Sequence, residues 1–456
     1  MYAMTALWFE SALLPGGWAR QVRLSASAGR IAQVTTDCGA QPGDERHALG
    51  LPGLPNLHSH AFQRGLAGLT ERRGAGEDSF WSWRELMYRF LERLGPQELE
   101  ALSAQCYLEM LEGGFTRVGE FHYLHHDLAG RPYADRGERA ARIAAAAQAS
   151  GIGLTLLPVF YAHAGFGGSV PAPRQRRFVT DPDGFGAILQ AARGVVQSLP
   201  GGALGIAPHS LRAVTAPELA AVLQLAAGAV IHIHIAEQTR EVDECLQWSG
   251  RRPIEWLLDA APVDERWCLV HATHATAAEL GGIAARCAVA GLCPLTEANL
   301  GDGIFPASEF LARAGRFGVG SDANVLLDAA AELRTLEYSQ RLTERRRNVL
   351  AAGSDSSTGR TLFAGALAGG QQALLPGEPA GLQPGAWLDL VSLDVSHPAL
   401  IERAGDELLD SWIFACGREA IDCVWRAGEK LVQGGRHRDR DAIGARYRAA
   451  LRHLRA

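Results

Sequence analysis

The run Leu51-Pro-Gly-Leu-Pro-Asn-Leu-His58 is the first of eight short apolar stretches that follow one pattern. Each stretch is rich in β-forming residues, ends at or near a polar residue, and precedes a helical stretch rich in Ala, Leu, Glu and Arg. This alternation indicates parallel βα units, and nearly continuous apolar strands indicate a sheet that is covered on both faces. The other stretches span residues 115–122, 153–160, 204–209, 230–235, 267–271, 287–294 and 316–322.

Eight βα units predict an α/β fold, a closed (β/α)8 barrel of the TIM type, over residues 51–379. An open, doubly wound sheet is the competing fold, but no Gly-x-Gly-x-x-Gly turn follows the first stretch. The two ends of the chain hold short alternating segments separated by Gly and Pro. We therefore expect residues 1–50 plus 380–456 to form one small β-sandwich domain, with a solvated helix over 439–456.

Composition restricts the partners of this chain. A formal net charge of −6 over 456 residues, without a Lys/Arg-rich run, argues against nucleic-acid binding. No apolar stretch reaches the ~18 residues of a membrane span, and the first ten residues carry no positively charged lead. The eight cysteines are scattered and are expected to be reduced thiols. We expect a cytoplasmic enzyme without nucleic-acid or membrane partners.

The strongest local signal is the segment NLHSH at residues 56–60, which ends the first predicted strand. Residues two apart on a strand face the same side, so His58 and His60 can grip one metal ion at the mouth of the barrel. Active-site residues of such barrels lie at the carboxyl ends of the strands, which makes this position informative.

The segment HIHIAE at residues 232–237 carries the next candidates. His234 is the predicted third ligand because it lies nearer the carboxyl rim than His232. We expect His232 to be a hydrogen-bonded core histidine, or else to orient a ligand. Glu237 follows just past the strand end, close to the predicted ligands.

Two further predicted strands end on ionisable residues, His271 and Asp322. Asp322 could instead cap the helix that follows it. Ionisable residues at four strand ends nevertheless favour a common site with Asp322 as a metal ligand. Imidazole and carboxylate ligands are typical of one Zn²⁺, with Fe²⁺ or Mn²⁺ as alternatives.

In this pattern the chain resembles the amidohydrolase superfamily, in its single-metal deaminase branch. That branch uses a His-x-His, a His-x-x-Glu, a His and an Asp at four strand ends, which correspond here to His58/His60, His234/Glu237, His271 and Asp322. The resemblance implies metal ligation by His58, His60, His234 and Asp322, and catalytic roles for Glu237, His271 and Asp322. Two-metal members add a carboxylated lysine from the barrel, but the only lysine here is Lys430, outside the predicted barrel.

The segments LPGLPNLHSHAFQRGLAG, GEFHYLHH, APHSLRAV, HIHIAEQ and TEANLGDGIFP resemble the N-formimino-L-glutamate deiminase family. This resemblance implies zinc-dependent hydrolysis of N-formimino-L-glutamate to N-formyl-L-glutamate and ammonia, in histidine degradation. It also implies a homodimer.

An anionic substrate needs arginines near the barrel mouth, because a guanidinium pairs with a carboxylate through two parallel hydrogen bonds. Arg212 follows the fourth predicted strand, and Arg84 lies in an aromatic-rich, lid-like insertion after the first. Gln63 and Tyr123 could add hydrogen bonds, and His209 could contact substrate or brace Arg212. Each of these residues could instead be an ordinary surface or packing residue.

Some features leave their interpretation open. His122, His125 and His126 suggest a second metal, although their loop position favours solvated or structural roles. The roles of Glu297 and Asn299 are open. A related aminohydrolase acting on a guanine, adenosine-type or triazine ring is the alternative function, since Trp81 and Trp83 could stack on a ring. A non-enzymatic scaffold is the remaining alternative.

Overall fold

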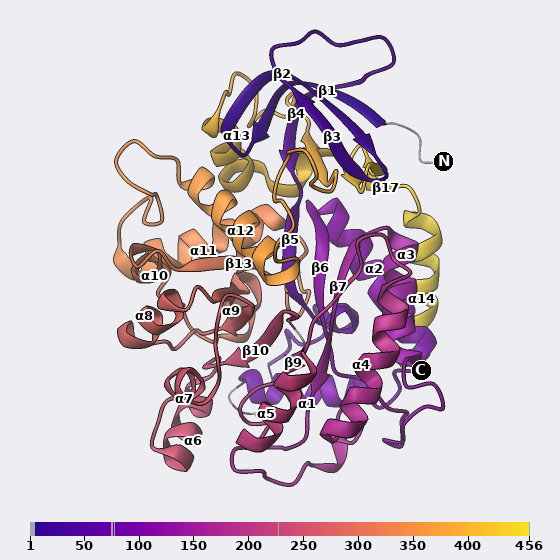
Figure 1. Ribbon diagram of the computed structural model, residues 1–456, viewed down its shortest axis with the longest axis vertical. Coiled ribbons are helices and arrows are strands. Elements are labelled where there is room, and N and C mark those ends of the chain that lie inside the picture. The colour runs from indigo at the N-terminus through magenta and orange to yellow at the C-terminus, as the bar shows by residue number, and fades with distance from the viewer. Residues whose placement is uncertain (1–4, 74–75, 77, 227, 456) are drawn as a thin grey trace.

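The computed structural model describes residues 5–73, 76, 78–226 and 228–455. Figure 1 shows a small sheet-rich domain at the top and, below it, a larger body of strands surrounded by helices. Residues 1–4 and 456 of the predicted end domain, and residues 74, 75, 77 and 227 of the predicted barrel, lie outside the described residues.

The larger body is a barrel of parallel strands. Two parallel sheets, β5 to β8 and β10 to β13, are joined by parallel bridges between Ile206 and Ile231 and between Ser59 and Asp322. The predicted α/β barrel class is therefore confirmed. Its strands are β5 (Leu54–Ser59), β6 (Phe115–His122), β7 (Gly153–Phe160), β8 (Ala203–Leu204) with β9 (Ala207–Pro208), β10 (Ile231–Ile235), β11 (Trp267–His271), β12 (Val289–Leu292) and β13 (Arg316–Val319).

Successive side chains of a barrel strand point alternately outward, into the hydrophobic core, and inward, into the barrel, and β10 shows this most clearly. All five of its residues are buried. Ile231, Ile233 and Ile235 join the main hydrophobic core. His232 and His234, on the other face of the strand, point into the barrel.

Helices surround the barrel, and some of them begin at a residue whose side chain caps the helix. The Asp328 carboxylate, for example, accepts hydrogen bonds from the N–H groups of Ala330 and Ala331 at the start of α11. The helices are α1 (Phe80–Leu91), α2 (Pro96–Glu112), α3 (Glu138–Ser150), α4 (Pro182–Val196), α5 (Ala216–Leu225), α6 (Thr239–Ser249), α7 (Pro253–Ala260), α8 (Ala277–Ala285), α9 (Pro294–Leu300), α10 (Ala307–Ala312), α11 (Ala329–Glu344) and α12 (Thr358–Leu374), with the short turns η1 (Ala61–Leu66) and η2 (Pro173–Gln175).

Both chain ends contribute to the small domain, whose strands form one hydrogen-bonded sheet in the order β17-β16-β15-β14-β4-β1-β2-β3. The first four strands in the chain are β1 (Thr5–Leu14), β2 (Gly17–Ser27), β3 (Arg30–Thr35) and β4 (Glu45–Pro52). The later elements are β14 (Leu390–Leu393), α13 (Asp406–Ser411), η3 (Trp412–Cys416), η4 (Gly417–Ala420), β15 (Ile421–Arg426), β16 (Glu429–Gln433) and β17 (Arg436–His437).

The junction between the sheet and the barrel lies at Gly53, two residues after the predicted start of the barrel. Leu51 and Pro52 end β4 in the small sheet, so the predicted first run is divided between two sheets. A Cβ atom at Gly53 would lie 2.2 Å from Cγ2 of Thr116. Only glycine allows the chain to pass this closely into β5.

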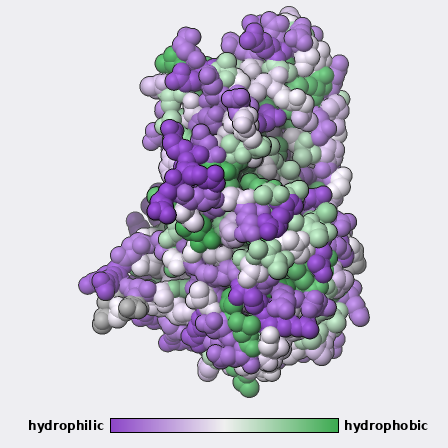
Figure 2. All heavy atoms as spheres, turned by 90° about the vertical axis from the view of Figure 1, so that its left-hand side faces the viewer, coloured by the Kyte–Doolittle hydropathy of each residue, from purple (hydrophilic) through white to green (hydrophobic). Residues whose placement is uncertain are grey.

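The C-terminal helix α14 (Arg440–Arg455) differs from the prediction. Expected to be solvated, it packs against α2 and buries Ile443, Ala450 and Leu454. Its sequence spaces these residues seven and four positions apart on one face, which the abundance of arginine obscured. Outside this face the helix is polar, as is much of the molecular face in Figure 2.

The cysteines described in the structure are free, as expected. Across residues 5–455, apart from the four undescribed positions, no helix combines the length and apolar character needed to cross a membrane.

Candidate active site

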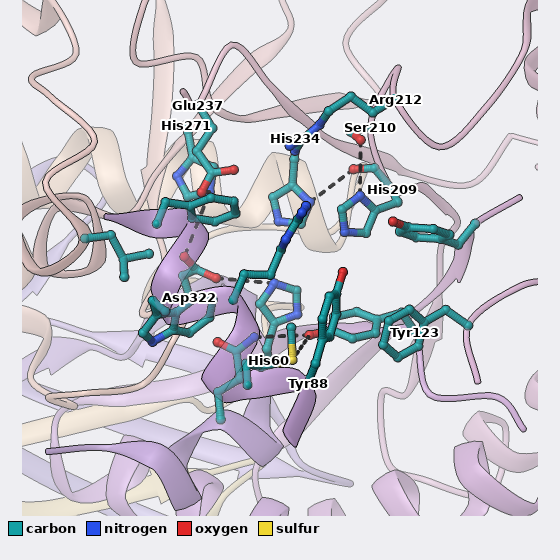
Figure 3. Close-up of a pocket in the computed structure, with 18 of the residues that line it drawn as sticks. His60, Tyr88, Tyr123, His209, Ser210, Arg212, His234, Glu237, His271 and Asp322 are labelled. Atoms are coloured by element: carbon teal, nitrogen blue, oxygen red, sulfur yellow. Dashed lines mark hydrogen bonds and ion pairs between the residues drawn. The ribbon is translucent and has the colours of Figure 1, made fainter. Parts of the chain in front are cut away.

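Four predicted ligands meet at the carboxyl end of the barrel. The Nε2 atoms of His58 and His234 are 3.1 Å apart. Asp322 Oδ1 lies 3.4 Å from Nε2 of His58 and 3.3 Å from Nε2 of His60. All four ligand atoms lie within 4.8 Å of one another, and all four residues are buried. Figure 3 shows three of these residues, His60, His234 and Asp322, around one point.

The hydrogen bonds of the imidazoles suit a metal ion. Nδ1 of His60 is 3.0 Å from the carbonyl oxygen of Phe121, and Nδ1 of His234 is 3.1 Å from that of His209. A carbonyl accepts only, so each Nδ1 carries the proton and each Nε2 presents its lone pair to the cluster. One ligand atom from each of three imidazoles and a carboxylate converges on this buried point, and Nδ1 of His58 has no hydrogen-bond partner, so the residues present fit a bound metal ion.

Burial sets the protonation of the cluster. It lowers the pKa of His58 to about 3 and also lowers the pKa of His60 and of His234, so these rings are neutral at pH 7. Burial alone would raise the pKa of Asp322, but the surrounding imidazoles, His58 first, hold it well below its usual range. Neutral imidazoles and an ionised carboxylate are the forms that bind metal.

Backbone strain accompanies the site. Ala236, His271 and Asp322 have φ values of 50°, 67° and 42°, in the left-handed region that side chains other than glycine rarely adopt. Buried hydrogen bonds oppose the strain. The Nδ2 group of Asn324 donates to the carbonyl oxygens of Asp322 and His60, at 2.8 and 3.0 Å.

Glu237, His271 and Glu297 form a chain of ionisable groups beside the cluster. Nδ1 of His271 is 3.2 Å from Oε1 of Glu297, while its Nε2 lies 3.9 Å from both Glu237 Oε1 and Asp322 Oδ2. Burial alone would lower the pKa of His271, but the three carboxylates, Glu237 first, raise it to about 10. Burial raises the pKa of Glu237 to about 7. A carboxyl group with a pKa near 7 can both donate and accept protons at neutral pH.

A pocket opens onto this cluster, and the two predicted arginines line it. Arg212 is only 8% exposed. The Nε atoms of both Arg84 and Arg212 are buried without a hydrogen-bond partner. Among the ion pairs formed by the described residues, none involves either arginine. Glu241 and Glu237 stabilise the charge of Arg212 without forming an ion pair with it. Buried guanidinium nitrogens that lack a hydrogen-bond partner are suited to an anionic ligand.

The other predicted substrate residues also line the cavity. Gln63 donates from Nε2 to the hydroxyl of Tyr123, at 3.2 Å, while its Oε1 has no partner. The ring of His209 packs between those of Tyr161 and His234, with centroid distances of 4.8 and 5.0 Å. Figure 3 shows His209, Ser210 and Arg212 together on one wall of the cavity.

Several lining residues were not predicted. Tyr88 and Met87 come from α1, and Tyr161 and Phe178 follow β7. Tyr161 directly follows a predicted strand, so its position offered a signal. Tyr88 offered none, because only the packing of α1 brings it to the site.

The contacts of the residues whose roles the sequence left open now indicate what each residue does. The Nε2 atoms of His125 and His126 lie 2.8 and 2.9 Å from backbone carbonyl oxygens, which supports structural roles. His232 is likewise a core histidine, 2.9 Å from the carbonyl oxygen of Ala373. Asn299 donates to Glu71 at an exposed position. Buried His122 has no partner for Nε2 and takes no part in the cluster.

Comparison with protein families gives two matches. Residues 50–364 match the Amidohydrolase family, and residues 4–48 match the N-terminal domain of Formimidoylglutamate deiminase HutF. The two matches meet close to the junction at Gly53.

Individual proteins give similar results. A formimidoylglutamate deiminase of Pseudomonas aeruginosa is 53% identical, over 95% of this chain and 96% of its own. An 8-oxoguanine deaminase of the same species is 26% identical, over 92% of this chain and 90% of its own.

Solved structures resemble this chain over nearly its whole length. The crystal structure of an amidohydrolase from Brucella melitensis has a TM-score of 0.96 and 54% identity, covering 99% of this chain and all of that one. An adenosine deaminase from Xanthomonas campestris with bound zinc has a TM-score of 0.82 over 99% of this chain and 98% of its own. Its identity of 22% shows a shared fold only.

Proposed function

We propose, because the chain belongs to the amidohydrolase family, that it hydrolyses N-formimino-L-glutamate to N-formyl-L-glutamate and ammonia, a reaction of histidine degradation. The relative with 53% identity and the matched N-terminal domain support this substrate. The observation that carries the proposal is the shared cavity, in which two arginines without carboxylate partners face a cluster of three histidines and an aspartate. The substrate's two carboxylates match the arginines, and its formimino group then faces the cluster.

We propose Zn²⁺ as the ion held by His58, His60, His234 and Asp322, with Fe²⁺ or Mn²⁺ as alternatives. When bound, such an ion supplies the Lewis acidity that activates water for attack at neutral pH. The protein residues orient the reactants and move the protons. Asp322 has one oxygen, Oδ1, toward the imidazoles and the other, Oδ2, toward His271, so Oδ2 can accept a proton from the attacking water.

Glu237 carries protons to the substrate. The formimino carbon gains the oxygen of water, and the terminal nitrogen gains both of its protons and leaves as ammonia. With its pKa near 7, Glu237 can take up a proton and deliver it to that nitrogen. His271, protonated at neutral pH, donates from Nε2 between Glu237 and Asp322 and stabilises charge on the reacting group.

Arg84 and Arg212 position the other end of the substrate. Paired with its carboxylates, they hold the reacting carbon over the cluster and disfavour uncharged amidines. Gln63, Tyr123 and His209 complete the proposed substrate contacts from the same cavity.

The alternative is an aminohydrolase acting on a guanine, adenosine-type or triazine ring. Trp83 lines the cavity and favours it. Trp81, however, is covered by the guanidinium groups of Arg84 and Arg240, 4.5 and 4.3 Å from its ring centroid. Fewer aromatic faces therefore remain for a ring than the sequence suggests.

The test is release of ammonia from N-formimino-L-glutamate, N-formimino-L-aspartate and guanine, with metal content measured on the same protein. We expect turnover of the glutamate compound, a lower rate with the aspartate compound and none with guanine. Preference for guanine would overturn the proposal. We also propose a cytoplasmic location, which rests on the composition of the chain. The proposed homodimer rests on family resemblance, and light scattering tests it.

A further inference from the structure

A second group of metal-ligating side chains lies in the small domain. His47 extends from β4, and Asp422 and Cys423 extend from β15. One ligand atom from each lies within 4.8 Å of the other two. None of the three residues belongs to the barrel or lines its cavity.

Strand geometry explains why these residues meet. β14 lies between β4 and β15, and its last residue, Leu393, pairs with Leu49. β4 extends beyond that pair to Glu45, so the side chain of His47 reaches β15 past the end of β14.

An irregularity in β15 completes the group. Ser392 pairs with Cys423 and Leu393 pairs with Ile421, which leaves Asp422 as the extra residue of a β-bulge. Successive side chains on a regular strand point to opposite faces. The bulge removes this alternation and brings the side chains of Asp422 and Cys423 together, with Cys423 Sγ 3.4 Å from Asp422 Oδ2.

The hydrogen bond of His47 prepares one ring nitrogen for a metal. Nε2 lies 2.9 Å from Oε1 of Glu45, so this nitrogen carries the proton and Nδ1 carries a lone pair. Nδ1 lies 3.8 Å from Asp422 Oδ2, too far for a hydrogen bond. A carboxylate that accepts a hydrogen bond from one ring nitrogen commonly orients the other ring nitrogen toward a metal ion.

The spacing of the ligand atoms suits a tetrahedral ion. Bonds of ~2.0–2.3 Å place neighbouring ligand atoms of a zinc site about 3.3–3.5 Å apart. The observed separations of 3.4 and 3.8 Å are close to this value. Cys423 is 3% exposed, whereas the side chain of Asp422 is 37% exposed, so an ion can enter from the Asp422 side.

The charge around the group is also favourable. Glu45 and Asp422 bring two carboxylates, and Nζ of Lys430 lies 2.5 Å from Oε1 of Glu45. Lys430 therefore neutralises the orienting carboxylate and leaves that of Asp422 for the ion.

We propose that His47 Nδ1, Asp422 and Cys423 bind a second divalent ion of the zinc type, which links the two chain ends of the small domain. Binding releases the thiol proton of Cys423 to solvent and forms one metal–sulfur bond, and water fills the fourth position. We assign this ion a structural role, because none of its three ligands lines the pocket at the barrel cluster.

Cobalt(II) tests the proposal without reference to activity. A thiolate bound to Co²⁺ gives a sulfur-to-metal charge-transfer band in the near ultraviolet, which imidazoles and carboxylates do not. We expect the full-length protein reconstituted with Co²⁺ to show this band, and Cys423→Ser to lose it. Asp322→Asn, which perturbs only the barrel cluster, should keep it.

Matched variants separate this site from other thiols and from misfolding. Cys38→Ser, at another free cysteine, should keep the band, and His47→Ala should lose or shift it. Zinc analysis should give about one equivalent fewer per chain for Cys423→Ser than for wild type. Absence of the band in wild-type protein, or its persistence in Cys423→Ser, would overturn the proposal whatever the barrel binds.

Discussion

Oε1 of Glu297 lies 3.2 Å from Nδ1 of His271 and thereby directs the opposite nitrogen, Nε2, toward Glu237 and Asp322. The same Oε1 accepts the N–H group of Cys293 at 2.9 Å. Glu297, on α9 just after β12, is therefore a positioning residue for His271 at the end of the neighbouring strand β11.

Glu297→Gln should lower the pKa of His271 from about 10, because a neutral amide no longer stabilises the imidazolium. We expect a decrease of roughly one unit or more, measured by NMR titration of the imidazole in metal-free protein. Glu309→Gln, at a half-buried position on α10 that pairs with Arg313, is the control. An unchanged His271 titration would remove Glu297 from this role.

Glu237→Gln should keep the metal and lose most of the turnover, because an amide cannot carry a proton to the leaving nitrogen. The expected loss in kcat is roughly 10²–10⁴-fold, with KM little changed. Glu244→Gln, at a half-buried position on α6 that pairs with Arg240, should retain wild-type kinetics. Near-normal kcat in the Glu237 variant would exclude it as the proton carrier.

Arg212→Met and Arg84→Met should each raise KM for N-formimino-L-glutamate, because a substrate carboxylate loses its charged partner. A charged hydrogen bond contributes about 1.5–3 kcal/mol, so we expect kcat/KM to fall roughly 10- to 100-fold. Arg251→Met, which removes an exposed ion pair with Asp259, should have no effect. The variants should also prefer the glutamyl compound over neutral formimino compounds less strongly, and an unchanged preference would contradict the assignment.

Glu120 should make the fold less stable as pH rises. Burial raises its folded-state pKa to about 8, from an ordinary value of 4.5. Between these values the folded protein keeps a proton that the unfolded chain has lost, so stability is full below pH 4.5 and decreases until about pH 8. The slope from this group approaches 1.4 kcal/mol per pH unit.

Glu120→Gln cannot titrate and should flatten this dependence, while its amide oxygen can still accept the N–H group of Ala61. Urea unfolding of the metal-free protein between pH 5 and 8 measures the difference. Parallel profiles for the variant and wild type would show that Glu120 is ionised in the folded protein.

His234→Ala should abolish turnover and reduce metal content, because it removes one of the four proposed ligands. Chelation of the wild-type protein should lower its Tm, since an ion that binds only the folded state stabilises it. Restored activity on adding Zn²⁺ is the expected result. Full turnover by protein shown to be metal-free would contradict the mechanism.

Much of the fold and of the metal cluster could be predicted from the sequence. The repeated βα pattern indicated a barrel, and a closed parallel barrel brings all carboxyl strand ends to one face. For this reason His58, His60, His234 and Asp322 could be proposed as a group although 264 positions separate the first from the last. The C-terminal helix was correctly predicted, but the expectation that it is solvated was wrong, because α14 packs against α2.

The sequence by itself determined which side chains stand at strand ends, because alternation along a strand is a local property that its residues encode. Only the tertiary structure decided which side chains from separate elements meet. Tyr88 reaches the cavity through the packing of α1, and Asp422 joins His47 through a bulge beside the end of β14. Such contacts depend on how separate elements pack, and the short-range periodicity of the sequence does not predict that packing.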